Sequence, residues 1–152
     1  MDLEVEIPEP MLWWFEGITS FYGDLACWRS GVWSENEYRE EMERKLNRHF
    51  GRLVPSRQSV SDSAQLAWVE GYRPDCWASE ARCSYYLEGE LIGLALDAEL
   101  RHRTEDHVCL IDVIREANAR YGLDGTIGGG LDHNRLNTVS YTHLTLPTNR
   151  EV

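Results

Sequence analysis

The apolar residues of this chain recur at helical spacing along most of its length, and one stretch near the start is apolar on almost every side. It runs from about Met11 to Arg29 and contains no proline. Wound at 3.6 residues per turn, it presents large apolar side chains on nearly all faces, which is typical of a buried helix. The helix should end at Ser30-Gly31, because glycine commonly follows a helix C-terminus. We expect the other helices to pack around it.

Further helices are predicted from capping residues and narrower apolar stripes, over about residues 34–50, 62–72, 81–103 and 110–121. The first of these opens with Ser34 and Glu37, which have the spacing of a capping box. Ser61 or Asp62 can cap the second, whereas Cys109, a poor capping residue, precedes the last. The helix over 81–103 has an apolar stripe made by Leu87, Leu91, Leu94 and Ala98. The sequence therefore predicts a mainly α fold.

Glu16 is a carboxylate placed among the large apolar side chains of the first helix. On a helical wheel it shares a face with Leu12 and Trp13 and with the smaller residues Thr19, Ser20 and Gly23. Burying an unpaired carboxylate costs several kcal/mol or more, so Glu16 needs a cation, a metal ion or a proton as partner. The residue types alone leave two interpretations open: an ion pair or cap within the fold, which is the commoner case, and a metal ligand.

Composition excludes several classes of partner. The formal net charge of −11 argues against nucleic acid and anionic membranes, because phosphate binding needs clustered lysine and arginine. No apolar run approaches the roughly 18 residues of a membrane span, and the acidic N-terminus is no signal peptide. The four cysteines form no C-x-x-C pair, so they are interpreted as free thiols: Cys27, Cys76, Cys83 and Cys109.

The stretch L-W-W-F-E-G-I-T-S-F-Y-G-D-L over residues 12–25 closely resembles the helix that carries the third ligand in the glycyl aminopeptidase family of zinc metallopeptidases. The resemblance continues, in the family's order, through residues 63–75, 84–97 and 110–122. It implies that residues 1–122 are part of a peptidase catalytic domain, the helical half of a thermolysin-like (gluzincin) fold. Such proteins usually carry a PDZ domain near the C-terminus.

By this resemblance, Glu16 of the W-x-x-E-G-x-T block is the third zinc ligand. In the family, an upstream H-E-x-x-H helix supplies two histidine ligands and the general base, and that helix is not in this chain. In the wider group of zinc aminopeptidases with a glutamate as third ligand, the tyrosine of a Y-x-K-G block donates its hydroxyl to the oxyanion of the tetrahedral intermediate. Here the block includes Tyr86 and Gly89, with Glu88 in place of the usual lysine. This difference from the family either alters the charge near the substrate or lies on the protein surface without effect on the site. Tyr85, the neighbouring residue, is the alternative oxyanion donor.

The chain alone is not expected to complete a zinc site. Two histidines at i and i+4 are required, and His102 and His107 are five apart, so they would diverge by about 140° on a helix. His49 is interpreted as a surface residue favoured by the C-terminal end of its helix. We therefore expect a fragment that is inactive alone, from a zinc enzyme removing N-terminal glycine or alanine from peptides. The alternative is a non-catalytic helical interaction module derived from the same family.

Two segments follow the predicted peptidase part. Residues 123–138 include the run D-G-T-I-G-G-G-L and are predicted to be a flexible segment; the run lacks the G-K-[ST] ending of a phosphate-binding loop. Residues 139–152 resemble the translation of a sequencing adapter and are predicted to be a read-through that is not native. Expected partners are a peptide substrate, the missing N-terminal half of the catalytic domain and a PDZ domain. The compartment stays open between the cytoplasm and the periplasm of a bacterium.

Overall fold

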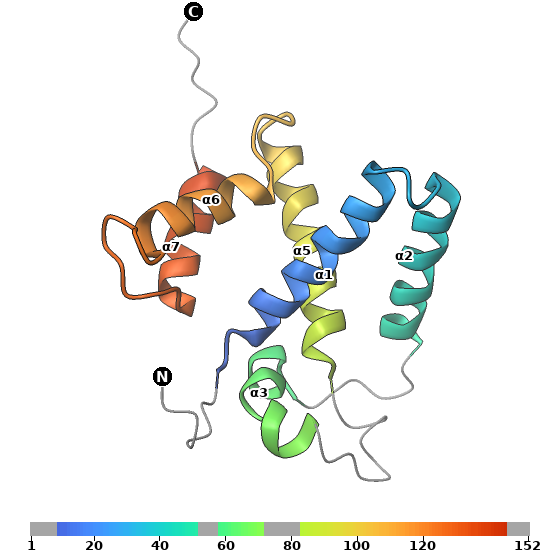
Figure 1. Ribbon diagram of the computed structural model, residues 1–152, viewed down its shortest axis with the longest axis horizontal. Coiled ribbons are helices and arrows are strands. Elements are labelled where there is room, and N and C mark those ends of the chain that lie inside the picture. Colours follow the sequence, from blue (N-terminus) through green and yellow to red (C-terminus); the bar gives the residue numbers. More distant parts are fainter. Residues whose placement is uncertain (1–8, 52–57, 72–82, 146–152) are drawn as a thin grey trace, which may run out of the picture. The chain divides into compact units, whose positions relative to one another are not determined.

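The computed structural model describes residues 9–51, 58–71 and 83–145, and all regular structure in these ranges is helical (Figure 1). The helices are α1 (Leu12–Arg29), α2 (Glu35–Phe50), α3 (Val60–Gln65), the π-helix η1 (Ala67–Gly71), α5 (Tyr85–Arg103), α6 (Leu110–Tyr121) and α7 (His133–Thr145). The predicted mainly α fold is confirmed. Two compact units, residues 1–93 and 94–152, divide the chain within α5.

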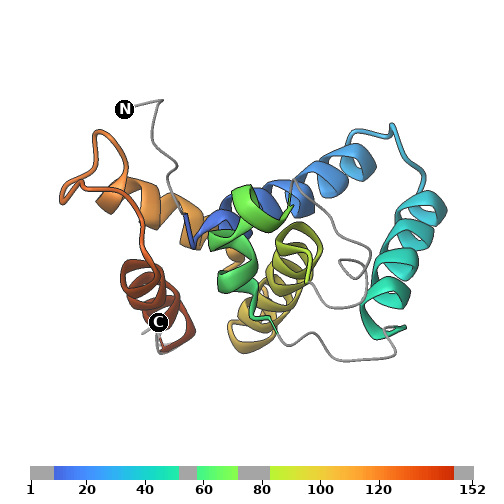
Figure 2. The same cartoon turned by 90° about the horizontal axis from the view of Figure 1, so that it is seen from below.

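Helix α1 is the centre of the first unit, as its apolar pattern predicts. Its buried side chains are Trp14, Ile18 and Phe21, and Met11 at its N-terminus is 1% exposed. The helix ends where predicted, because the Ser30 N–H still bonds to the Ala26 carbonyl and Gly31 follows with φ of +79°. Figures 1 and 2 both show α3 near the start of α1, and α2 turning back at an angle after the end of α1; α1 contacts both helices.

A pair of glycines sets the closest approach of α1 and α5. A Cβ atom added at Gly17 would lie 2.5 Å from the Gly89 Cα, and one added at Gly89 would lie 3.1 Å from the Gly17 Cα and against the Trp13 carbonyl. No side chain fits at either position, so the two backbones touch directly. The crossing point is therefore fixed by the absence of side chains on both helices.

Two predicted helix starts are wrong, while the capping box of α2 is confirmed. Ser34 and Glu37 make the reciprocal bonds of that box. Helix α3 is capped by Ser59, whose Oγ accepts the Asp62 N–H at 3.0 Å, and not by Ser61 or Asp62. Helix α5 begins at Tyr85 rather than at about residue 81, because the Ser84 Oγ accepts the Leu87 N–H at 3.3 Å. In both cases an earlier or later serine satisfies an orphan N–H.

The buried side of α5 also differs from the predicted stripe. Leu87 is buried at 5% exposure, but Ala98 is exposed and Leu91 and Leu94 are only half-buried. Two glutamates, Glu88 and Glu90, are buried instead, at 8% and 3% exposure. The distribution of apolar residues on a helical wheel could not predict the burial of these two carboxylates, because it depends on basic partners from another helix.

In the second unit, α6 and α7 pack on each other around buried Val113, Ala117, Leu136 and Val139. The glycine-rich run between them folds back on α6: Thr126 and Gly128 donate to the Ala119 and Arg120 carbonyls. These bonds satisfy carbonyls that the last turn of α6 would leave free. Helix α7 begins inside the segment predicted to be flexible and continues past residue 139. The foreign origin of residues 139–152 stays a prediction.

No helix within the described ranges is long and apolar enough to cross a membrane.

Candidate functional site

Glu16 lies in the second turn of α1, between exposed Phe15 and buried Gly17, and its side chain is half-buried. In the parts of the chain that the structure describes, no cation contacts its carboxylate. Within the same ranges, no group of three or more His, Cys, Asp or Glu side chains could hold a metal ion. Metal binding at Glu16 would therefore need ligands from outside these residues.

Tyr86 lies in the first turn of α5 and is 41% exposed. Its ring is tilted against that of Tyr85, with 4.7 Å between the centroids. At 100° per residue, Tyr86 and Tyr85 project about 60° and about 40° to opposite sides of the direction of Gly89, which meets α1. Both tyrosines thus flank the helix crossing, so helical direction alone favours neither as the functional residue.

The glycine contact brings the two candidate residues to one crossing. Glu16 is one residue from Gly17 and Tyr86 is three from Gly89, which at 1.5 Å per residue is about 1.5 Å and about 4.5 Å along the two helices. Both residues therefore lie within one turn of the point where α1 and α5 touch. A shared concavity for their two side chains stays a prediction.

Glu88 is not a surface residue, so that interpretation of the Y-L-E-G block is wrong. The Glu88 side chain is 10% exposed, and its Oε2 lies 2.7 Å from Nδ1 of His49 at the end of α2. His49, interpreted as a surface residue, keeps 38% of its side chain exposed but forms this pair. No sequence pattern indicates this pair, because 39 residues separate its members and only the fold brings the end of α2 close to the start of α5.

A half-buried ion cluster lies one turn earlier on α2. The Lys45 ammonium contacts Asp24 of α1, Oε1 of Glu90 at 2.5 Å and Oε1 of Glu41 at 3.6 Å. Burial raises the pKa of Glu90, and the hydrogen bond from Lys45 opposes that rise. Lys45 is thus the common cation of α1, α2 and α5. Sequence reasoning missed it, since a lysine on a highly charged helix is usually solvated.

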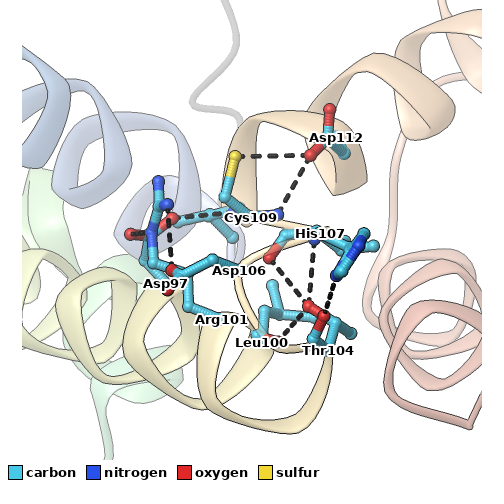
Figure 3. A network of polar contacts seen from close by, with 10 residues as sticks. Asp97, Leu100, Arg101, Thr104, Asp106, His107, Cys109 and Asp112 are labelled. Carbon is cyan, nitrogen blue, oxygen red and sulfur yellow. Dashed lines mark hydrogen bonds and ion pairs between the residues drawn. The ribbon is translucent and has the colours of Figure 1, made fainter. Parts of the chain in front are cut away.

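In the second unit, polar contacts organise the turn from α5 to α6 (Figure 3). The Asp97 carboxylate accepts the Leu110 N–H at 2.8 Å and pairs with Arg101 at 2.7 Å. Asp112 accepts the N–H of Cys109 at 3.0 Å and its thiol at 3.3 Å. Cys109 is indeed a poor cap, and the neighbouring carboxylates satisfy the helix N-terminus instead. Burial and the nearby Asp112 raise the pKa of the Cys109 thiol, which disfavours a nucleophilic thiolate there.

Comparison with known proteins identifies the family to which the sequence of the first unit is similar. A profile of the M61 glycyl aminopeptidase family matches residues 1–92, which include Glu16, Gly17, Tyr86 and Gly89. The crystal structure of an aminopeptidase N family protein from Idiomarina loihiensis is similar, with 34% sequence identity and a TM-score of 0.71. The similarity covers 76% of this chain and 20% of that chain, so the chain spans about a fifth of that protein's length. A search of curated proteins found no match.

Proposed function

The chain belongs to the M61 glycyl aminopeptidase family, and from this premise we propose that it supplies one zinc ligand and the oxyanion donor of a zinc-dependent aminopeptidase. The observation that carries the proposal is the Gly17–Gly89 contact, which brings the turns bearing Glu16 and Tyr86 to one crossing. Activity would need zinc ligands beyond the described residues, because a catalytic zinc needs three protein ligands and an open position.

Glu16 would hold the metal through its carboxylate. A carboxylate oxygen is a normal zinc ligand, and Glu16 fits the role because it is half-buried with no competing cation among the described residues. Its place on a helix backed by buried Trp14 and Ile18 gives the carboxylate a rigid base. A bound zinc ion supplies Lewis-acid polarisation of the scissile carbonyl and activation of water.

Tyr86 would donate its hydroxyl to the oxyanion that develops when the peptide carbonyl is attacked. Its 41% exposure leaves the ring accessible to a ligand, and its helix start is fixed by the Ser84 cap. A preorganised donor of this kind is worth about 100- to 1000-fold in rate. Family membership further supports peptides with N-terminal glycine or alanine as substrates, with zinc as cofactor. The rest of a catalytic domain is the required partner, and a C-terminal PDZ domain is a further expected part.

A chimera tests this function. The matching segment of the Idiomarina loihiensis protein would be replaced by this chain's residues, and the zinc content and hydrolysis of glycine and alanine anilides compared with the unmodified parent. We expect Glu16→Gln to lose zinc. Tyr86→Phe should retain zinc but lose about 100- to 1000-fold in kcat.

Tyr85→Phe is the matched control, because it removes the neighbouring hydroxyl from the same turn. A rate loss in Tyr85→Phe with none in Tyr86→Phe would transfer the role to Tyr85. Full zinc content in the Glu16→Gln chimera would reject Glu16 as a ligand and favour the non-catalytic interaction module.

A further inference from the structure

Three consecutive residues of α5 are each held by a different group. Glu88 pairs with His49 at 2.7 Å, Gly89 lies against the backbone of Gly17, and Glu90 bonds to Lys45 at 2.5 Å. The side chains of Glu88 and Glu90 are only 10% and 5% exposed. Burial of two carboxylates is costly, and in some proteins such buried charges serve to fix one particular geometry.

The three contacts restrain rotation of α5 about its own axis. Successive helical residues diverge by 100°, so contacts at Glu88, Gly89 and Glu90 spread over about 200° of the circumference. By helical geometry the side chains of Glu88 and Glu90 start about 200° apart on α5, and a turn of the helix in either sense would carry one of them away from its contact on α2. His49 and Lys45 are four residues apart, which places them on one face of α2. Two residues on one face of α2 thus contact the side chains that flank Gly89 in the sequence of α5.

The position of Tyr86 depends on these contacts of Glu88, Gly89 and Glu90, because they restrain the rotation of α5. Tyr86 precedes Glu88 by two residues and projects about 60° from Gly89, on the side of Glu90. A functional side chain must be held within about 0.5 Å and 10–20° of its productive geometry. A modest rotation of α5 would therefore be enough to displace the Tyr86 hydroxyl.

We propose that Glu88 and Glu90, through His49 and Lys45 of α2, are positioning residues that fix the rotation of α5 and thereby the placement of Tyr86. The proposal deepens the proposed function, since it rests on Tyr86 as the oxyanion donor. In this proposal α2, which carries neither Glu16 nor Tyr86, fixes the orientation of the helix that carries Tyr86.

Charge reversal at the His49–Glu88 pair tests the proposal in the full chain. The variants are Glu88→Lys, His49→Glu and the double variant that exchanges the two charges. The readouts are the ring resonances of Tyr86 in tyrosine-labelled protein, assigned with Tyr86→Phe, and amide exchange in the first turns of α5. Each single variant should shift the Tyr86 resonance and accelerate that exchange roughly tenfold or more. The double variant should restore both towards the original values.

The exposed Arg39–Glu35 pair of α2 is the matched control, since its side chains are 73% and 60% exposed. The same exchange of charges there should leave Tyr86 unchanged. Should Glu88→Lys fail to fold, Glu88→Gln, which removes the charge without reversing it, answers the same question. An unchanged Tyr86 resonance in a folded Glu88 variant, or no restoration in the double variant, overturns the positioning role. The proposed function would survive that result, because it fails only in the zinc and rate measurements of the chimera.

Discussion

Lys45 is the residue on which the electrostatics of the first unit depend. Its ammonium, 17% exposed, contacts Asp24, Glu41 and Glu90 from three helical segments of the chain. Three carboxylates around one cation leave a net negative cluster, and burial already raises the pKa of Glu90. Removing the cation would leave these carboxylates without their shared compensation.

Lys45→Met should therefore lower the free energy of unfolding by more than an exposed pair contributes and by at most about 3–5 kcal/mol, the cost of breaking a fully buried pair, because the Lys45 side chain keeps 17% exposure. Arg39→Met is the control, because its ion pair with Glu35 is exposed and should contribute only about 0–1 kcal/mol. Urea unfolding of both variants measures the difference. Equal losses would mean that the Lys45 cluster is solvated and contributes little to the fold.

Asp112 gives the second unit a predictable dependence on pH. The Cys109 N–H, and secondarily its thiol and Arg115, hold the pKa of Asp112 below its ordinary value of 3.8. A lowered pKa means that the unfolded chain binds the proton first, so this stabilisation is present above about pH 4 and is lost as the pH falls through the folded value.

Asp112→Asn should remove this part of the acid sensitivity, because asparagine can still accept the Cys109 N–H but does not titrate. We expect the unfolding temperature of the variant to fall less steeply than that of the original chain between about pH 5 and pH 2. Asp124→Asn, at an exposed loop acid of the same unit, is the control. Parallel pH profiles for the original chain and Asp112→Asn would contradict the assignment.

Among individual residues, sequence reasoning found those whose role depends on near neighbours. The Ser34–Glu37 capping box spans three residues, so its pattern is complete in the sequence. The Glu88–His49 contact joins positions 39 residues apart, and it exists only because the fold brings the end of α2 close to the start of α5. Nothing in the periodicity of either helix indicates that contact.

At the scale of elements, the sequence predicts α1 and α6 almost to the residue, because residues that end a helix lie directly beside both segments. The close approach of Gly17 and Gly89 could not be predicted in this way, since a glycine within a helical pattern indicates only a lower helix propensity at that position. Its importance appears once the backbones of α1 and α5 are seen to touch. This contact then explains why a glycine lies in the second turn of both α1 and α5.

Gly17→Ala should destabilise the first unit by about 1–3 kcal/mol or more, because the added methyl group meets the backbone of Gly89 and forces α1 and α5 apart. Gly23→Ala is the matched control on the same helix: nothing lies within 4 Å of its added Cβ, so the change should stabilise by about 0.5–1 kcal/mol. Chemical denaturation followed by circular dichroism measures both. The crossing is refuted if the two variants behave alike.

At the scale of the whole molecule, the family match covers residues 1–92, and the chain spans about a fifth of the similar crystal structure. The fold class and family could be predicted, because the sequence blocks that carry them are local. The roles of Glu16 and Tyr86 as a zinc ligand and an oxyanion donor remain proposals. A zinc site at Glu16 would need ligands from outside the described residues, and no pattern within one helix can supply them.

The stability of Glu16→Gln in this chain tests most directly whether Glu16 serves a ligand rather than the fold. Thermal unfolding of both proteins would be measured with a chelator present, so that no metal contributes. We predict an equal or higher unfolding temperature for Glu16→Gln, because a half-buried carboxylate without a cation costs free energy that a neutral amide avoids. A loss of about 3–5 kcal/mol, the cost of breaking a buried ion pair, would instead show that Glu16 is a structural partner and not a zinc ligand.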